Sequence, residues 1–281
     1  MGKIVIMTDS TSDLPASFVE ANEISIIPLY VNFKDTAYRD GVDIEPAQLY
    51  QIVSETDVFP KTASPSPSDF LQAFTPAIDA GHDVLYIGLS SRLSSTIQNA
   101  RIAASEFGDH RIEIIDSLNL SAGIGLLVMK AVQLNQEGSL GLKDLADKIR
   151  MLVPKVRTFF AVDTLEYLHG GGRCSALENL VGSMLRIRPI LQVVDGQIIV
   201  NRKVRGKREK LLQEMLGILD ANRIRPELVM VNHSMCPEMA DALTHHIQQL
   251  MPNAQVMITQ AGCVISSHCG PKTFSFVYFE K

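Results

Sequence analysis

The chain has 281 residues, of which 46% are hydrophobic and 20% charged, and its net charge is −5. This composition is typical of a globular protein with a sizeable core, and the length corresponds to about two domains. The acidic balance argues against a nucleic-acid-binding protein, which usually concentrates basic residues on one face. No apolar run reaches the roughly 18 residues of a transmembrane segment, and the first residues lack a signal peptide's apolar region. We therefore expect a cytoplasmic protein.

Strands and helices alternate in the first half of the chain. Apolar runs predict strands over Lys3–Met7, Ile24–Phe33, Asp83–Gly88 and Ile112–Ile115, with Pro28 marking an edge or a break in the second. Helices are predicted from Pro15 to Glu20, from Pro46 onward, and after a capping box formed by Ser66 and Asp69. A further helix contains Ile97 and Phe107, and two more are predicted over Ala122–Gln136 and Leu142–Val153. This order indicates a mainly parallel sheet with helices on both faces.

The second half has a different pattern, with more strands in succession. Strands are predicted over Thr158–Val162, Ile190–Val194, Gln197–Val200, Leu228–Asn232, Gln255–Thr259 and Thr273–Phe279. Asp195-Gly196 is a strong signal for a two-residue hairpin turn. Helices are predicted over Ala176–Ile187, Lys207–Asn222 and Pro237–Met251. We therefore expect two α/β domains, residues 1–156 with the parallel sheet and residues 157–281 with a mixed sheet.

Three loops in the first hundred residues are rich in hydroxyl groups. They are Thr8-Asp9-Ser10-Thr11-Ser12, Thr62-Ala63-Ser64-Pro65-Ser66 and Ser90-Ser91-Arg92-Leu93-Ser94-Ser95-Thr96, and each precedes a predicted helix. In a parallel α/β sheet, strand ends and helix starts meet at the crevice where ligands usually bind. Hydroxyl groups and free helix N–H groups gathered there favour an anion or a carboxylate.

Single hydroxyl groups in these loops also have structural explanations. Ser94, Ser95 and Thr96 can cap the following helix, although four serines and a threonine in seven residues exceed what a cap needs. Thr62 and Ser64 lie in a loop that Pro65 and Pro67 stiffen, which suits a fixed hydroxyl group.

Asp9, His268 and the cysteines are further candidates. Hydrogen bonding to loop amides is the favoured role of Asp9. His268 lies in a predicted compact turn before the last strand and is equally open to a structural or a functional role. The four cysteines, at 174, 236, 263 and 269, lack a CxxC pair and indicate free thiols. A zinc site from Cys263, His268 and Cys269 has no supporting ligand spacing, so we expect no metal and no cofactor.

Two arginines stand out on exposed elements. Arg173 follows three glycines, and Arg202 opens the densest basic cluster of the chain, which ends at Arg208. The simple interpretation is a solvated surface. Arginine also binds phosphates and acidic partners through two parallel hydrogen bonds, and a basic cluster at a helix start opposes the helix dipole. Docking of a partner is therefore slightly favoured.

Taken together, the motifs resemble those of the DegV family, the fatty-acid-binding subunits of bacterial fatty acid kinase. The resemblance runs from end to end. It is carried by Thr8-Asp9-Ser10-Thr11-Ser12-Asp13-Leu14-Pro15, by the second and third hydroxyl loops, by Gly171-Gly172-Arg173 and by Arg188-Pro189-Ile190-Leu191. This chain departs from the family pattern at Ser95, where a glycine is common, and at Lys272 and Phe274, which are expected to narrow or reshape the pocket mouth.

The resemblance implies a long-chain fatty acid buried between the two domains. Its carboxylate is then held by the hydroxyl groups of Thr62 and Ser94, with His268 nearby, and Ser95 is also expected to bind the carboxylate. A separate ATP-binding kinase subunit phosphorylates that carboxylate to an acyl phosphate, and Arg173 and Arg202 face this subunit or its phosphate. The chain itself is then not an enzyme, and the sequence agrees in having no G-x-x-x-x-G-K-[ST] phosphate loop.

Two other functions remain open at this stage. A serine hydrolase or acyltransferase would use Ser94 and His268, with Asp9 as the orienting acid, although the second glycine of a G-x-S-x-G nucleophile elbow is missing. A carrier or sensor for another apolar acid would need no kinase partner.

Overall fold

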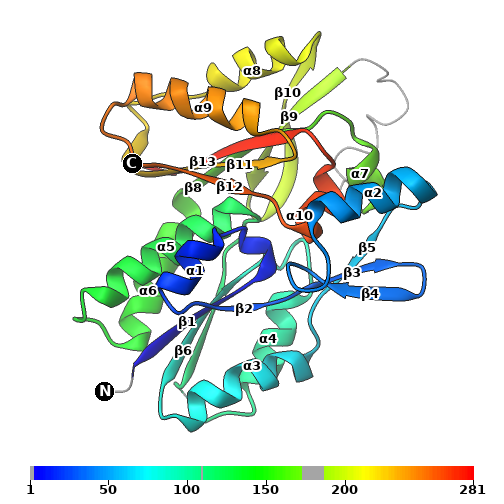
Figure 1. Cartoon of the computed structure of the whole chain (residues 1–281). Coiled ribbons are helices and arrows are strands. Elements are labelled where there is room, and N and C mark those ends of the chain that lie inside the picture. The colour runs from blue at the N-terminus through cyan, green and yellow to red at the C-terminus, as the bar shows by residue number, and fades with distance from the viewer. Residues whose placement is uncertain (1–2, 109, 173–186) are drawn as a thin grey trace.

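The first half of the chain is built on a four-stranded parallel sheet. The computed structural model describes residues 3–108, 110–172 and 187–281. The sheet has the order β2 (Ser25–Ile27), β1 (Ile4–Asp9), β6 (Asp83–Gly88), β7 (Ile112–Asp116). Its central strands are mainly apolar, with Ile4–Met7 in β1 and Val84–Ile87 in β6, because helices cover both faces, as Figure 1 shows.

Two pairs of helices cover this sheet. Helices α3 (Pro67–Asp79) and α4 (Thr96–Ala104) pack on one face, against Val84 and Tyr86. Helices α5 (Ala122–Gln136) and α6 (Leu142–Leu152) pack on the other, against Leu85 and Ile87. Alternate residues of β6 thus enter opposite cores, as strand geometry requires. The short α1 (Ala16–Ala21) and the 3-10 turns η1 (Ser10–Ser12) and η2 (Val153–Lys155) complete this layer.

A small antiparallel sheet stands beside the parallel one. Its order is β4 (Thr36–Arg39), β3 (Tyr30–Phe33), β5 (Lys61–Ala63), and α2 (Pro46–Thr56) lies between β4 and β5 in the chain. The strand predicted over 24–33 is therefore two strands in two different sheets, with Pro28 in the break. The β4 strand was not predicted, since its run Thr-Ala-Tyr-Arg carries little apolar periodicity.

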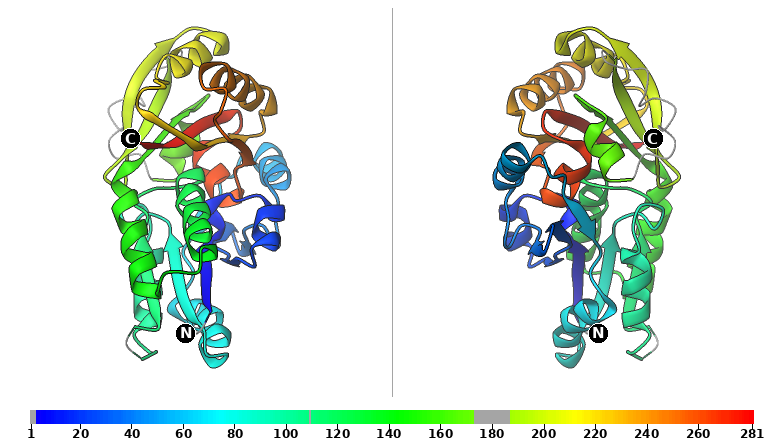
Figure 2. Two further views of the ribbon diagram at one scale, coloured as in Figure 1. Left: turned by 90° about the vertical axis from the view of Figure 1, so that its left-hand side faces the viewer. Right: turned by 90° about the vertical axis from the view of Figure 1, so that its right-hand side faces the viewer.

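The second half carries a six-stranded mixed sheet. Its order is β10 (Gln197–Arg205), β9 (Ile187–Val194), β8 (Val156–Ala161), β13 (Thr273–Glu280), β11 (Ile224–Ser234), β12 (Val256–Gln260). Only the β11–β12 pair is parallel among these neighbours. Helices α8 (Arg208–Leu216) and α9 (Pro237–Leu250) pack on one face, and α7 (Glu166–Gly170) and α10 (Cys263–Cys269) lie on connections. The two sheets lie one above the other along the molecule (Figure 2).

Two sequence predictions in this half differ from the structure, and a third falls almost entirely outside the described residues. The helix predicted over 207–222 ends at Leu216, and the following Gly217 closes it through a hydrogen bond to the Gln213 carbonyl. The segment predicted as a turn around His268 is the helix α10. The helix predicted over 176–187 falls outside the described residues, except that residue 187 begins β9.

One hydrophobic cluster joins the two halves. It contains β1, β6 and α5 residues of the first half together with Met230 of β11 and Val277 and Phe279 of β13. Helix α5 lies between the two sheets, and from Ala122 to Val128 every residue is buried. A helix that is apolar all round is typical of such a central position. The structure is thus α/β throughout, as the sequence predicts, with β8 starting at Val156.

Candidate functional site

A narrow cavity opens between the inner face of the six-stranded sheet and the first half of the chain. Its lining comes from both: Leu29, Thr62, Ala63, Ser64, Leu89, Leu93, Ser94, Leu120 and Ser121 from the first half, and Thr158, Phe160, Leu168, Ile198, Asn232, Val264, Ile265, His268, Cys269, Thr273, Ser275 and Val277 from the second. Among these described residues there is no Asp, Glu, Lys or Arg. The cavity is therefore suited to a slender, mainly apolar ligand.

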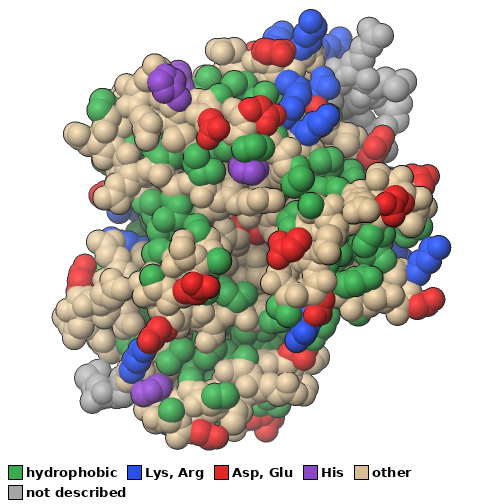
Figure 3. Space-filling view, in the orientation of Figure 1, with side chains coloured by type: hydrophobic (Ala, Val, Ile, Leu, Met, Phe, Trp, Pro, Cys, Tyr) green, Lys and Arg blue, Asp and Glu red, His purple; other side chains and the backbone are tan. Residues whose placement is uncertain are grey.

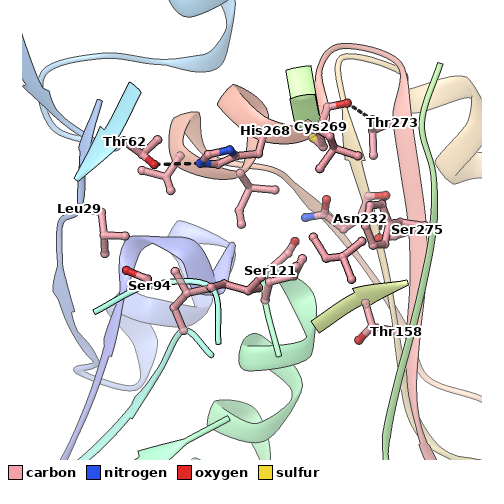
Figure 4. A pocket seen from close by; sticks show the side chains of 18 of the residues that line it. Leu29, Thr62, Ser94, Ser121, Thr158, Asn232, His268, Cys269, Thr273 and Ser275 are labelled. Carbon is pink, nitrogen blue, oxygen red and sulfur yellow. Dashed lines mark hydrogen bonds between the residues drawn. The ribbon is translucent and has the colours of Figure 1, made fainter. Parts of the chain in front are cut away.

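One side of the cavity carries a polar pair that the sequence analysis singled out. Thr62 lies on β5 and His268 on α10, 206 residues apart, and Thr62 Oγ1 lies 2.8 Å from His268 Nε2. Both side chains are half-buried. Figure 4 shows them facing each other, with Ser94 below Thr62 on the same side of the cavity. The structure thus brings a strand residue, a helix residue and a loop residue to the same side of the cavity.

Ser94 and Ser95 have different positions although they are adjacent. Ser94 lines the cavity, and its Oγ lies 2.8 Å from Thr96 Oγ1 at the start of α4. Ser95 is exposed and is not among the lining residues described, and its Oγ lies 2.7 Å from Ser64 Oγ. Consecutive residues of a turn point in different directions, so only one of the two serines turns inward.

The opposite side of the cavity has polar groups that the sequence analysis missed. Ser121, Thr158, Asn232 and Ser275 are each less than 10% exposed and come from four different elements or their starts (Figure 4). Most of their hydrogen-bonding capacity is satisfied: Thr158 donates to Asn119 Oδ1, and Asn232 Nδ2 donates to Thr259 Oγ1, both at 2.8 Å. The available signal was a polar residue inside an apolar strand, such as Ser275 between Phe274 and Phe276.

Comparison with known proteins shows the family of this chain. Residues 3–281 match the family model described as "Uncharacterised protein, DegV family COG1307". A DegV domain-containing protein of Clostridium acetobutylicum is 34% identical over the whole of both chains. The chain belongs to the DegV family.

Solved structures of this family have the same fold. A DegV family protein of Thermus thermophilus, whose structure is described as showing fatty acid binding, is 30% identical with a TM-score of 0.88, over 99% of this chain and 100% of that one. The B3 protein of the Streptococcus pneumoniae fatty acid kinase (Fak), loaded with linoleic acid, has a TM-score of 0.87 over 99% and 100% of the chains. At 22% identity, the second comparison shows a shared fold.

In this DegV-family chain, Asp9 has the structural role that the sequence favoured. Its buried carboxylate accepts hydrogen bonds from the Thr11 and Leu89 amides, both at 3.0 Å, and from the Tyr86 hydroxyl at 2.8 Å. Burial raises the pKa of Asp9, and these hydrogen bonds offset part of that rise. A carboxylate with these partners ties the β1 loop to β6, so the structure gives no support to Asp9 as the orienting acid of a hydrolase.

The three residues considered for zinc have other contacts. Cys263 Sγ lies 3.3 Å from the Ile44 carbonyl, and His268 Nε2 lies beside Thr62. Burial raises the pKa of Cys269 to about 12, so this thiol does not ionise near neutral pH. No group of three or more metal-binding side chains was found in residues 3–108, 110–172 and 187–281.

Arg202, Lys272 and Phe274 are not among the described residues that line the cavity. Arg202 is on the edge strand β10 and forms an ion pair with Glu214 at 3.1 Å, while Arg173 lies outside the described residues. Basic side chains gather over the β10–α8 region in Figure 3. The expectation that Phe274 narrows the pocket mouth is wrong, because Phe274 points to the other face of the sheet and packs in the core beneath α8 and α9. Lys272 is exposed.

Proposed function

We propose that this protein binds a long-chain fatty acid and presents its carboxylate to a separate ATP-binding kinase subunit. The acyl chain would occupy the cavity, and the carboxylate would be held by Thr62, Ser94 and His268. The observation that carries this proposal is the Thr62–His268 pair, on the same side as Ser94 of a cavity whose described lining has no Asp, Glu, Lys or Arg. The fatty acid binding described for the Thermus thermophilus relative supports it.

The energetics favour retention of such a ligand. Burying a CH₂ group gains about 0.8 kcal/mol, so a chain of roughly 16 carbons gains on the order of 12 kcal/mol before the costs of association. The carboxylate loses its water on entering, which is costly unless hydrogen bonds replace that water. We propose that the hydroxyl groups of Thr62 and Ser94 and the imidazole of His268 do so, in exchange for the contacts that they make with one another and with Thr96.

The uncharged site also suits the reaction that we propose for the partner. A carboxylate oxygen attacks the γ-phosphorus of ATP, the bond to the β-phosphate oxygen breaks, and ADP leaves as the acyl phosphate forms. An ion pair with Lys or Arg would lower the nucleophilicity of that oxygen. Hydroxyl donors leave one oxygen accessible, so the carrier would bind the ligand without blocking the transfer.

The proposed partner of this protein is a kinase subunit. A protein of the same fold is named as part of a fatty acid kinase, which makes such a subunit the partner to test. We propose that Arg173 and Arg202 face it, Arg202 from the basic region of β10 and α8. Kinase binding that is unchanged in an Arg202→Glu variant would count against this placement.

The first experiment is to purify the protein without added lipid, denature it and identify the organic extract by mass spectrometry. A near-stoichiometric fatty acid is expected. An empty extract, together with no uptake of added fatty acid, would remove the lipid-binding premise.

The second experiment tests whether Thr62 and Ser94 hold the carboxylate during phosphoryl transfer. Thr62→Ala and Ser94→Ala should keep the fold and lose at least about tenfold in acyl phosphate formation with a kinase subunit and ATP, because each removes a hydrogen bond to a charged group. The controls are Thr56→Ala and Ser105→Ala, whose hydroxyl groups bond to helix carbonyls on the surface. Full turnover in both cavity variants would contradict the proposal, and acyl ester hydrolysis by the protein alone would favour the hydrolase alternative.

A further inference from the structure

Helix α10, which carries His268, is held at its N-terminus by carboxylates from the other half of the chain. Asp40 Oδ1 accepts the Cys263 amide hydrogen at 2.6 Å, and Asp40 Oδ2 accepts that of Val264 at 3.2 Å. Asp13 Oδ1 accepts the Gly262 amide hydrogen at 2.8 Å. These are the N–H groups that a helix cannot satisfy internally. The residue at the N-cap position, Gly262, has no side chain that could accept these hydrogen bonds, so residues distant in the sequence accept them.

Asp40 belongs to the same small sheet as Thr62. Asp40 directly follows β4, its amide donates to the Leu29 carbonyl at 2.9 Å, and β3 pairs with both β4 and β5. Val31 of β3 is the register partner of Thr62. One rigid unit therefore holds Thr62 directly and holds the helix of His268 through Asp40.

Other contacts fix the same helix to the segment that follows Asp40. Cys263 Sγ lies 3.3 Å from the Ile44 carbonyl, and the Tyr50 hydroxyl lies 3.2 Å from the Ser266 carbonyl. Asp40 is only 2% exposed, so its two hydrogen bonds to α10 are shielded from water. A displacement of this carboxylate would shift the start of a seven-residue helix and, with it, the imidazole near its end.

We propose that Asp40 is a positioning residue for the carboxylate site: by capping α10 from the small sheet, it sets His268 against Thr62. This inference rests on the proposed function, and it adds a residue that is not among the described lining residues but is hydrogen-bonded to the backbone of two of them, Leu29 and Val264. Asp40 acts on the recognition of the acid group, so its substitution should weaken the binding of a ligand with a carboxylate more than that of a ligand without one.

The test compares a fatty acid with the primary alcohol of the same chain length. Both bury the same apolar chain, and only the acid presents a carboxylate to His268 and Thr62. Asp40→Asn should reduce the ratio of acid to alcohol affinity by about tenfold, the effect of one charge-assisted hydrogen bond. Asp43→Asn is the matched control, because Asp43 lies in the same loop and pairs with Arg39 at the surface, away from α10.

A second variant displaces the cap without removing the charge. A Cβ at residue 262 would lie 3.2–3.3 Å from the carboxylate oxygens of Asp40 and Asp13, so Gly262→Ala should push them outward and lower the same ratio to a smaller extent. This variant also serves if Asp40→Asn does not fold.

A double-mutant cycle decides whether Asp40 acts through His268. In a His268→Ala background, Asp40→Asn should have no further effect on the affinity ratio. The proposal is overturned if Asp40→Asn weakens acid and alcohol equally, or if its effect persists without His268. If the unaltered protein binds neither ligand, the proposed function itself fails, and that outcome is distinct from the other two.

Discussion

At the scale of single residues, the approach of Gly171 to His268 is the tightest constraint on the candidate site. A Cβ at residue 171 would overlap the imidazole ring at Nδ1. In the sequence, the three glycines stood out only because they precede Arg173. In the structure, the middle glycine is also what lets α7 pack beside His268.

We predict that Gly171→Ala displaces the His268 ring and lowers fatty acid affinity by about tenfold, the effect of one hydrogen bond to a charged group. The affinity is measured by titration of the delipidated protein. Gly108→Ala is the control, since a Cβ there meets no atom within 4 Å. Equal affinities in the two variants would show that the ring position is not critical.

Residues of the site were predictable where the chemistry is local. The hydroxyl-rich loops that contain Thr62 and Ser94 are a pattern visible in the sequence, while the choice of these two residues within the loops came from the resemblance to the DegV family. Asp40 was missed because the amide that it caps is 223 residues away, and no local pattern records that contact. Asn232 and Ser275 carry a signal for a buried polar residue, but the sequence does not show which cavity they face.

At the scale of elements, the β9–β10 hairpin links the two halves. Its turn residue Gly196 has φ +79°, and its carbonyl accepts a hydrogen bond from Ser90 Oγ at 2.9 Å. A Cβ on Gly196 would lie 2.5 Å from that Ser90 Oγ. The turn thus requires glycine for its backbone and for its close packing against the third hydroxyl loop.

We predict that Gly196→Ala lowers the free energy of unfolding by about 2–3 kcal/mol, measured by urea denaturation. Left-handed backbone at a non-glycine residue accounts for about 1 kcal/mol, and the clash with Ser90 for the rest. The control is Gly138→Ala, which has φ +70° and no atom within 4 Å of the added Cβ. A decrease in the free energy of unfolding no greater than in Gly138→Ala would show that the loop of Ser90 accommodates the added Cβ without an energetic cost.

Elements with local signals were predicted well. The capping box at Ser66 and Asp69 forms as expected, and the Asp195-Gly196 turn joins β9 to β10. Helix α10 was missed for a physical reason: its start is capped by Asp13 and Asp40, which are distant in sequence. Without those partners, the run Cys263–Cys269 has weak helix propensity because every residue except His268 is a β-branched, hydroxyl or thiol residue.

At the scale of the whole molecule, buried carboxyl groups lie where the two halves meet. Asp13 accepts hydrogen bonds from Ser121 Oγ and the Gly262 amide. Burial raises the pKa of Asp13 well above its usual range, and the charges of Asp40 and Asp9 raise it further, while those hydrogen bonds lower it in part. The native protein therefore binds this proton more tightly than the unfolded chain does.

We predict that this group stabilises the fold fully below the unfolded pKa of about 4, and that this contribution is lost as the pH rises through the raised native pKa. The neutral variant Asp13→Asn should flatten that part of the profile when unfolding is measured in urea at a series of pH values. Asp43→Asn is the opposite case, because Arg39 lowers the pKa of Asp43 to about 2. Identical slopes in the unaltered protein and in Asp13→Asn would refute the assignment.

The placement of α5 between the two sheets has a consequence for how the protein opens. Because one hydrophobic cluster includes β1, α5, β11 and β13, neither sheet can separate from this helix without exposing the core of the other. Amide hydrogens in the middle of α5 should therefore exchange with deuterium only through complete unfolding. We therefore expect a ligand to enter and leave the cavity without separation of the two sheets.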